Sequence, residues 1–429
     1  MKPLLFLKHY LSILLIFGTF VSGFSQVEKD SLIEITGKII DSKTNDPLVF
    51  ADLLVSDSNI ATISNTEGNY ILKLPSDFLN RSITITYLGY AEKEIAVATI
   101  LENSTISLDA TFTPLEEINI SRPKSAEILV RFMLERKADN YIESGLEMTG
   151  FYRETIKKRR QNASLSEAVV SIYKEPNGSY KQDAVEIIKV RKNTNYSKLD
   201  TLALKLQGGP FNNLYVDIMK YPQYIFSTEN VSNYEFSFDK STVINDQLVY
   251  VVNFKQKPEI IMPLYYGKLF IDAKNYALTS AIYSLNVENQ DLASELFVKR
   301  KPRRVKVYPV EANYRVNYRN SNGKWHYSYS NILLTFKVNW KGRIFNNIYT
   351  LNSEMAITNW TYTDERYSRP ENKSSILRPS SILIDEASGF SDPEFWGQYN
   401  IIEPEKSIES AIEKIQKQLD KNRDDTETE

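Results

Sequence analysis

Few side chains in this sequence could act directly in catalysis. It holds two histidines, His9 and His326, and it holds no cysteine. Once an amino-terminal leader is removed, a Ser-His-Asp triad could be built only around His326. A histidine-rich zinc site is excluded, because one histidine is too few for it. His326 comes directly after a predicted turn, where an exposed strand histidine is the simpler interpretation. We expect no catalytic residue, no metal site and no cofactor.

Carboxylates are abundant, with 54 Asp and Glu residues, and a suitably spaced pair can hydrolyse a glycosidic bond. The adjacent pairs Glu116-Glu117 and Asp364-Glu365 are most simply explained as solvated side chains. The stretch Gly208-Gly209-Pro210 lacks the lysine and the following helix of a phosphate-cradling loop. No pattern indicates a catalytic site, so the sequence predicts a protein that is not an enzyme.

Two basic runs could contact lipid phosphates at a membrane surface. Their residues are Lys157, Lys158, Arg159 and Arg160 in the first run, and Lys299, Arg300, Lys301, Arg303 and Arg304 in the second. Both runs fall between predicted strands, where a solvated turn is the alternative interpretation. The formal net charge of −2 gives no basic footprint for a nucleic-acid partner. Without cysteine, no disulfide-linked partner is expected either.

The first elements that could position a site lie in the stretch Ile35–Ile120. Apolar and polar residues alternate there in short runs such as Ile35–Ile39 and Tyr70–Leu74. Turn signals separate these runs at close spacing, which is typical of a small all-β sandwich. Gly68 and Gly89 lie in two of the turns, and we expect them to need positive φ or close approach of the backbone.

A set of residues in this stretch is also found in a known family. The set comprises Gly37, Asp41, Pro47, Leu48, Ala51, the turn Thr66–Tyr70, the stretch Tyr87–Tyr90 and the stretch Pro114–Ile118. On these residues the stretch resembles the carboxypeptidase regulatory-like domain, a transthyretin-like sandwich common on exported proteins of the Bacteroidetes. A similar module precedes the plug and barrel of TonB-dependent outer-membrane receptors, but the roughly 310 residues that follow here are too few for that barrel. The zinc carboxypeptidase motifs are absent, so the resemblance does not imply that activity.

Residues 1–25 are expected to form a secretory signal peptide. Lys2 and Lys8 give it a positive start. Leu11–Phe20 is an apolar core too short to span a bilayer comfortably, and Gly23-Phe24-Ser25 offers a cleavage site. An uncleaved anchor is the alternative. We therefore expect an exported protein of the periplasm or the outer membrane.

The rest of the chain is predicted to be a helix followed by a broad antiparallel sheet. Ser125 can cap the helix, and apolar residues at helical spacing extend it to Ile142. From Met148 to Trp360 the pattern is that of long strands in hairpins, with an irregular stretch that could cross the sheet as a short helix at Asn212–Ser227. The later strands are expected at Tyr234–Ile244, Leu248–Gln256, Tyr265–Asp272, Leu278–Asn286, Lys306–Tyr318, Trp325–Asn339 and Ile344–Trp360.

One hairpin of this sheet, Tyr266–Asp272 with Tyr276–Ala281, resembles a hairpin of the lipoprotein-carrier (LolA/LolB-like) half-barrel. In that family an open sheet curls around a helix and encloses an apolar cavity. Leu269 and Ile271 should share one face of the strand, because side chains alternate. The resemblance implies that these two residues line a ligand-binding cavity. The alternative is a closed core, packed by the helix and by the later loop segment.

The expected fold is mainly β. It consists of an N-terminal Ig/transthyretin-like sandwich and a larger curved antiparallel sheet, half-barrel-like, with a packed helix. The expected domains are a signal peptide at 1–25, the sandwich at 33–111, a linker at 112–124, the helix and sheet at 125–360, a loop segment at 361–403, a helix at 404–421 and a disordered tail at 422–429.

These features predict an exported, non-enzymatic envelope protein that acts as a binding or scaffold component at the outer membrane. Its partner would be an apolar ligand such as a lipid, or an outer-membrane protein. The alternative is a carbohydrate-binding or glycan-processing accessory protein. A sugar site would need aromatic platforms on an exposed face, whereas a lipid site would need the apolar face of the curled sheet left open.

Overall fold

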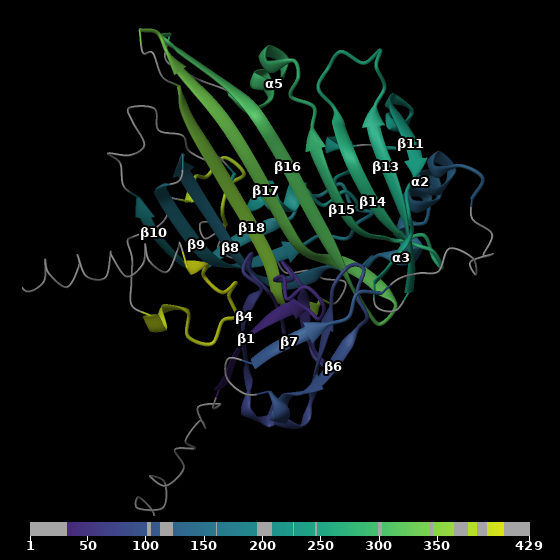
Figure 1. Cartoon of the computed structure of the whole chain (residues 1–429), viewed down its shortest axis with the longest axis vertical. Helices are drawn as coiled ribbons and strands as arrows, with labels where there is room; N and C mark the ends of the chain where they lie inside the picture. Colours follow the sequence, from purple (N-terminus) through teal and green to yellow (C-terminus); the bar gives the residue numbers. More distant parts are fainter. Residues whose placement is uncertain are drawn as a thin grey trace, which may run out of the picture.

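The computed structural model describes residues 32–100, 104–111, 123–159, 161–194, 208–225, 227–244, 247–298, 303–342, 346–363, 376–383 and 393–406. These residues form two β units, a small sandwich within 32–111 and a large sheet that begins after residue 123 (Figure 1). The predicted signal peptide and tail lie outside the described residues, as do most of the predicted linker and of the predicted C-terminal helix.

The small unit consists of two sheets that pack face to face. Its strands are β1 (Leu32–Asp41), β2 (Asp52–Val55), β3 (Ala61–Ile63), β4 (Asn69–Pro75), β5 (Ser82–Thr86), β6 (Lys93–Ala96) and β7 (Ser104–Leu108), with short 3-10 helices η2 (Ser76–Asn80) and η3 (Val97–Thr99). One sheet has the order β4-β1-β7 and the other β3-β2-β5-β6. The predicted all-β sandwich is confirmed.

Strand alternation decides which residues fill the sandwich core. Ile39, Leu72 and Leu74 are fully buried in it, as their alternating positions predict. Gly68 has a φ of +80°, and a Cβ atom there would lie 2.6 Å from the carbonyl oxygen of Ile39. Gly89 has a φ of +85°. Both glycines thus adopt the backbone conformation predicted for them, which other residues rarely adopt.

Two residues on which the family resemblance rests, Asp41 and Tyr90, meet at one end of the sandwich. The Asp41 carboxylate accepts N–H bonds from Thr44 (2.8 Å) and Lys43 (2.7 Å) and a bond from the Tyr90 hydroxyl (2.7 Å). These bonds, led by the one from Thr44, lower the pKa of Asp41 to about 2. The carboxylate therefore stabilises the turn after β1 and ties it to the loop that holds Tyr90.

The large unit is an 11-stranded sheet. Its strands are β8 (Leu146–Lys158), β9 (Gln161–Lys174), β10 (Ala184–Thr194), β11 (Tyr234–Phe238), β12 (Thr242–Ile244), β13 (Gln247–Gln256), β14 (Tyr265–Asp272), β15 (Leu278–Leu285), β16 (Val305–Ser321), β17 (Lys324–Trp340) and β18 (Asn347–Tyr362). The order is β10-β9-β8-β18-β17-β16-β15-β14-β13-β11, and β12 pairs with β13. Every pairing in it is antiparallel, as predicted.

The chain enters this sheet in the middle rather than at an edge. β8 pairs with β9 on one side and with the last strand, β18, on the other. After β10, at one edge, the chain must cross to β11, at the other edge, before β13 to β18 return as a meander. The crossing carries a short helix, α4 (Pro210–Tyr215), and two 3-10 turns, η4 (Pro222–Tyr224) and η5 (Val231–Asn233).

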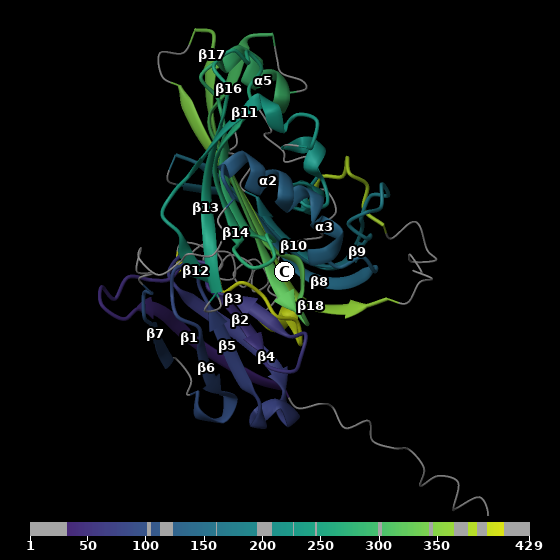
Figure 2. The same ribbon diagram turned by 90° about the vertical axis from the view of Figure 1, so that its right-hand side faces the viewer.

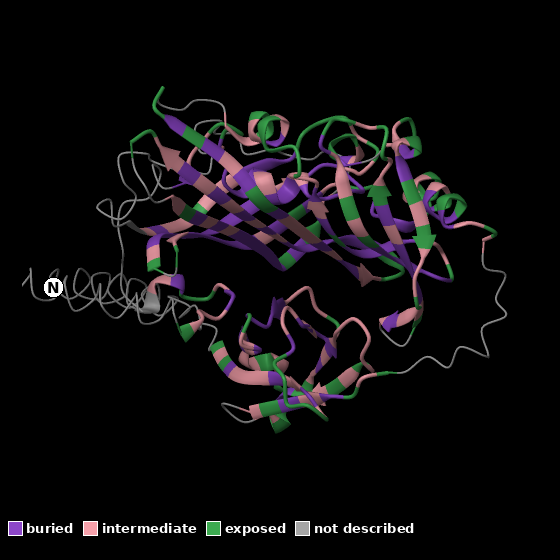
Figure 3. Ribbon diagram, turned by 45° about the horizontal axis from the view of Figure 1, so that its top comes forward, coloured by how far each residue is buried: buried purple, intermediate pink, exposed green. Residues whose placement is uncertain are grey.

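The two faces of the large sheet are covered by different elements. We call the inner face the one that packs against α4 and against helices α2 (Ala126–Glu135) and α3 (Lys137–Asn140). The outer face packs against the sandwich (Figure 2). A further helix, α5 (Gln290–Phe297), lies beside β16. Buried residues alternate with half-buried ones along much of the longest strands, β16 and β17 (Figure 3).

Two expected elements are each divided into two. Ser125 caps α2 by accepting the Ile128 N–H (3.2 Å), but the helix expected to reach residue 142 is interrupted at Arg136, and its second part, α3, ends at Asn140. The chain turns there and buries Tyr141, whose hydroxyl donates to the carbonyl oxygen of Leu278. The single strand expected at 234–244 is two strands, because the chain turns at Asp239, which accepts the Lys240 N–H (2.7 Å).

Residues 393–406, which we call the strap, run between the sandwich and the outer face. The strap begins with the 3-10 helix η6 (Pro393–Trp396). Its Asn400 side chain accepts the Lys73 N–H (2.6 Å) and donates to the Lys73 carbonyl oxygen (2.9 Å). On the other side, buried Arg153 donates to the carbonyl oxygen of Ile402 (2.8 Å). The strap thus binds to both units. The sequence predicted only a loop for the part of it before residue 404.

Candidate functional site

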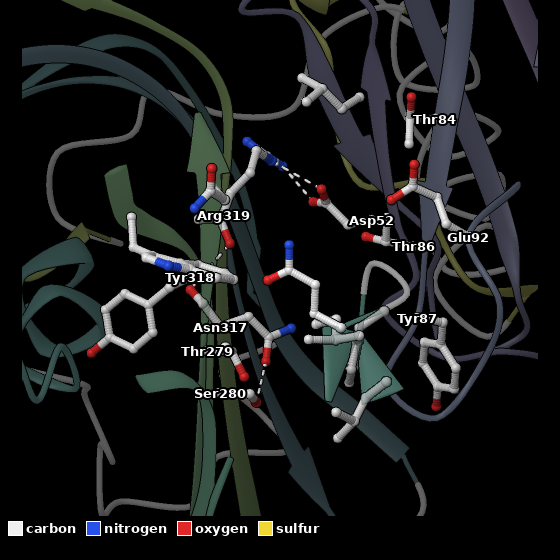
Figure 4. Close-up of a pocket in the computed structure, with 18 of the residues that line it drawn as sticks. Asp52, Thr84, Thr86, Tyr87, Glu92, Thr279, Ser280, Asn317, Tyr318 and Arg319 are labelled. Carbon is white, nitrogen blue, oxygen red and sulfur yellow. Dashed lines mark hydrogen bonds and ion pairs between the residues drawn. The ribbon is translucent and has the colours of Figure 1, made fainter. Parts of the chain in front are cut away.

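A pocket of about 490 Å³ lies between the sandwich and the outer face of the large sheet (Figure 4). Its volume is within the range of roughly 300–1,000 Å³ that is usual for small-molecule sites. Polar and apolar side chains from both units line it. The pocket therefore exists only where the two units meet.

The sandwich wall of the pocket comes from β2 and β5. In these paired strands Leu53, Val55 and their neighbours on β5 point into the sandwich core and are fully buried. The alternate residues point the other way and line the pocket; they are Asp52, Leu54, Thr84 and Thr86. Two strands of an ordinary sandwich thus present a carboxylate and two hydroxyls to the space beside the sheet.

The opposite wall comes from β15, β16 and β17. Ala281 and Val316 point to the inner face and are fully buried, so their strand neighbours Ser280 and Asn317 face the pocket. These two are partners in strand register, and the Ser280 hydroxyl donates to the Asn317 Oδ1 atom (2.8 Å). The neighbouring Arg315 also donates from Nε to this oxygen (3.2 Å).

An ion pair closes one end of the pocket. Arg319 on β16 donates from Nε to Asp52 Oδ2 (2.9 Å) and from a second guanidinium nitrogen to the other carboxylate oxygen. Figure 4 shows both contacts between the side chains. The Arg319 side chain is 4% exposed and the Asp52 side chain 24%. Because the pair is bidentate and largely buried, it fixes the spacing of the two walls.

Aromatic rings line the pocket as well. They belong to Phe50, Tyr87 and Trp325, with Tyr318 beside them. Phe50 has a φ of +63°, a conformation that is unusual for a bulky residue and that clusters at functional sites. Its ring lies 4.8 Å from that of Tyr329, and the Arg315 guanidinium carbon lies 5.6 Å from its centre.

The pocket combines charged, hydrogen-bonding and aromatic groups. Arg315 and Lys274 provide positive charge, while hydroxyl and amide groups provide donors and acceptors beside aromatic surfaces. His326, the histidine considered above, is 2% exposed rather than exposed as predicted. It packs against Trp360 with 4.7 Å between ring centres. Burial, with a smaller effect of the Arg319 charge, lowers the pKa of His326 to about 3, so the ring is neutral at ordinary pH.

The structure places the two residues predicted to line an apolar cavity in the inner-face core. Leu269 and Ile271 are both fully buried there. They do share one face of β14, and neither of them lines the pocket between the units. Phe270 points to the outer face and packs with Val249 and Val251. Binding of an apolar ligand at Leu269 and Ile271 stays a prediction.

The structure brings the described parts of the two basic runs to the same end of the large sheet. Lys157 and Lys158 end β8, and Arg159 follows in the turn. Arg303 and Arg304 directly precede β16, whose first residues lie near the end of β8 across β17 and β18. Arg160, Lys299, Arg300 and Lys301 lie outside the described residues.

The residues that form the pocket were not predicted from the sequence. Asp52, Thr84 and Thr86 occupy outward positions on strands, which have the same pattern as solvated residues.

Among the residues that the structure describes, no three His, Asp or Glu side chains gather closely enough to hold a metal ion. Within the same residues, no helix combines the length and the apolar character needed to cross a membrane.

Comparisons with known proteins give the following similarities. Residues 35–120 match the model of the CarboxypepD_reg-like domain, so the resemblance predicted for the sandwich is confirmed. No curated protein matches the chain.

The solved structures that are similar to this chain include a LolA superfamily protein from Nitrosomonas europaea, at 9% identity and a TM-score of 0.21, which covers 57% of this chain and 98% of that one. A DUF1329 family protein from Desulfovibrio piger has 9% identity and a TM-score of 0.25, with coverage of 58% and 99%. A lipovitellin structure, described for its lipid–protein interactions, has 7% identity and a TM-score of 0.26, with coverage of 60% and 29%.

Proposed function

We propose that this protein is a non-enzymatic binding protein whose pocket between the sandwich and the sheet holds a polar, sugar-sized ligand. The observation that carries the proposal is the pocket itself, with its hydroxyl, amide and charged groups set among aromatic rings. Sugars offer hydroxyls to such polar groups and apolar ring faces to aromatic side chains. Of the two functions expected from the sequence, carbohydrate binding is the one that this lining supports.

An exported location, at the periplasmic or outer-membrane side of the envelope, is part of the same proposal. It is supported by the signal-like residues 1–25 and by the regulatory-like sandwich.

A variant that fills the pocket tests the proposal. Thr84 lies on β5 with its side chain in the pocket, so Thr84→Trp places a large ring where the ligand would lie. Thr105 lies exposed on β7 of the same sandwich, and Thr105→Trp is the matched control. Binding of each protein to a panel of immobilised bacterial and plant polysaccharides is measured. We expect the wild type and Thr105→Trp to bind the same glycan, and Thr84→Trp to bind it at least about tenfold more weakly, a loss of roughly 1.4 kcal/mol.

Failure of the wild type to bind any glycan, or equal binding by Thr84→Trp, would contradict a sugar site in this pocket. The same proteins also test the apolar-ligand function. Leu269 and Ile271 lie on the inner face, away from Thr84, so a ligand held there is insensitive to Thr84→Trp. A fluorescent fatty acid that binds the wild type and Thr84→Trp equally would support an apolar ligand on the inner face instead.

A further inference from the structure

Strand pairing places the two basic runs beside one another, although they are far apart in the sequence. The Arg159 N–H donates to the carbonyl oxygen of Ile348 on β18 (2.9 Å). Ile348 is the register partner of Lys337 on β17, and Lys337 is the partner of Tyr308 on β16. Since neighbouring strands lie about 4.8 Å apart, the row from Arg159 to Tyr308 is only about 15 Å long.

Three cations of this region lie on the outer face. Lys306 is flanked by Val305 and Val307, and both valines are buried on the inner side. Lys337 is flanked in the same way by Phe336 and Val338. Since side chains alternate along a strand, Lys306 and Lys337 point outward together. Lys157, which follows buried Ile156, points outward by the same alternation.

The charge of this end of the sheet is strongly one-sided. Among the described residues 155–159, 303–311, 333–341 and 347–352, the acid is Glu311. The bases in the same ranges are Lys157, Lys158, Arg159, Arg303, Arg304, Lys306, Lys337 and Lys341. Because the whole chain has a formal net charge of −2, this concentration of positive charge is local. Its sign is complementary to that of lipid phosphates.

Apolar side chains lie exposed among these cations. Ile348 is 43% exposed and Val310 41%. The sandwich packs near the other end of the long strands, where its pocket is lined by residues of β16 and β17 between Arg315 and Ser328 (Figure 1). In the described part of the chain, this end of the outer face is therefore left uncovered by the sandwich.

We propose that the surface formed by Lys157, Arg159, Lys306, Lys337, Val310 and Ile348 docks on an anionic membrane. The cations would contact lipid phosphates, and the two apolar side chains would enter the headgroup region between them. Such docking leaves the pocket between the units at the other end of the strands, turned away from the membrane. The proposal is independent of what the pocket binds.

Sedimentation with lipid vesicles tests this surface in the full-length protein. The vesicles are phosphatidylcholine alone, or phosphatidylcholine mixed with phosphatidylglycerol. The test variant is Lys306→Glu/Lys337→Glu. The control, Lys181→Glu/Lys240→Glu, makes the same change of net charge at exposed lysines outside the surface. Thermal unfolding of both variants verifies that they are folded.

We expect the wild type and the control to sediment with the anionic vesicles, and to be released by salt. The test variant should bind them at least about tenfold more weakly, because each basic residue near an anionic surface contributes substantially to binding. Equal binding to neutral and anionic vesicles would overturn the proposal, and so would equal losses in the two variants. Absence of vesicle binding by the wild type would overturn it as well. Salt-sensitive binding to an acidic protein, without binding to vesicles, would also overturn it and would identify a protein partner for this surface.

Discussion

At the scale of single residues, Glu154 on β8 is an unusual group. Its carboxyl is buried, and the Tyr152 hydroxyl donates to Oε2 (2.8 Å). The other carboxylate oxygen has no hydrogen-bond partner among the described residues. Burial raises the pKa of Glu154 to about 7 from an ordinary value of 4.5, against a smaller lowering effect of the bond from Tyr152. The folded protein therefore holds this proton more tightly than the unfolded chain does.

We predict that this carboxyl makes the free energy of unfolding depend on pH. The bound proton stabilises the folded protein fully below about pH 4.5, and this stabilisation is lost as the pH rises toward about 7. The reason is that the pKa of Glu154 is higher in the folded protein than in the unfolded chain. Glu154→Gln keeps the shape of the side chain and cannot ionise. We expect denaturant unfolding at several pH values to show that the free energy of unfolding of the variant rises relative to that of the wild type across this window. The total change should be on the order of 3 kcal/mol. A difference between the two proteins that is constant with pH would contradict the assignment.

Single residues also show what local pattern can and cannot predict. The burial of Leu269 and Ile271 on one face follows from alternation, which is a property of the strand itself. The burial of His326 does not, because it depends on Trp360, which lies on the next strand of the sheet. The same holds for Asp52, whose partner Arg319 is far along the chain. An ion pair between two units cannot be predicted from the local sequence around either residue.

At the scale of elements, the strands and hairpins were largely predictable from the sequence. The turn between β16 and β17 places Asn322 and Gly323 at φ of +53° and +81°, as expected for a tight hairpin. The return of β18 to pair with β8 was not predictable, because it joins strands separated by most of the sheet. The strap was missed for a related reason. Its apolar residues are buried only because two separate units meet over them.

The strap should make a measurable contribution to stability. Trp396 is 3% exposed, and its ring lies 5.4 Å from that of Phe151 on β8. We predict that Trp396→Ala lowers the free energy of unfolding of the full-length protein by about 3 kcal/mol or more, because a large buried ring is lost. Trp340→Ala, at a partly exposed position near the end of β17, is the control and should cost less. Equal losses in chemical denaturation would show that the strap does not hold the two units together.

At the scale of the whole molecule, the two units form one site. The sandwich contributes Asp52 and Thr84, the sheet contributes Arg315 and Ser280, and neither set encloses a pocket by itself. The sequence predicted both units and their fold class, since each depends on local alternation and turns. It did not predict the pocket, because the pocket depends on how the sandwich docks. The polar lining supports a binding function for that interface.

The most direct test of the central claim is to follow the indole N–H resonances of the protein by NMR while the glycan that binds it is added. The chain has four tryptophans, and Trp325→Phe assigns the resonance of Trp325. Trp325 lines the pocket, whereas Trp396 belongs to the strap, is buried outside the pocket and serves as the internal reference. We predict that the Trp325 resonance shifts to saturation while that of Trp396 stays in place. A bound glycan that leaves the Trp325 resonance unmoved would contradict the claim that the pocket between the two units is the binding site.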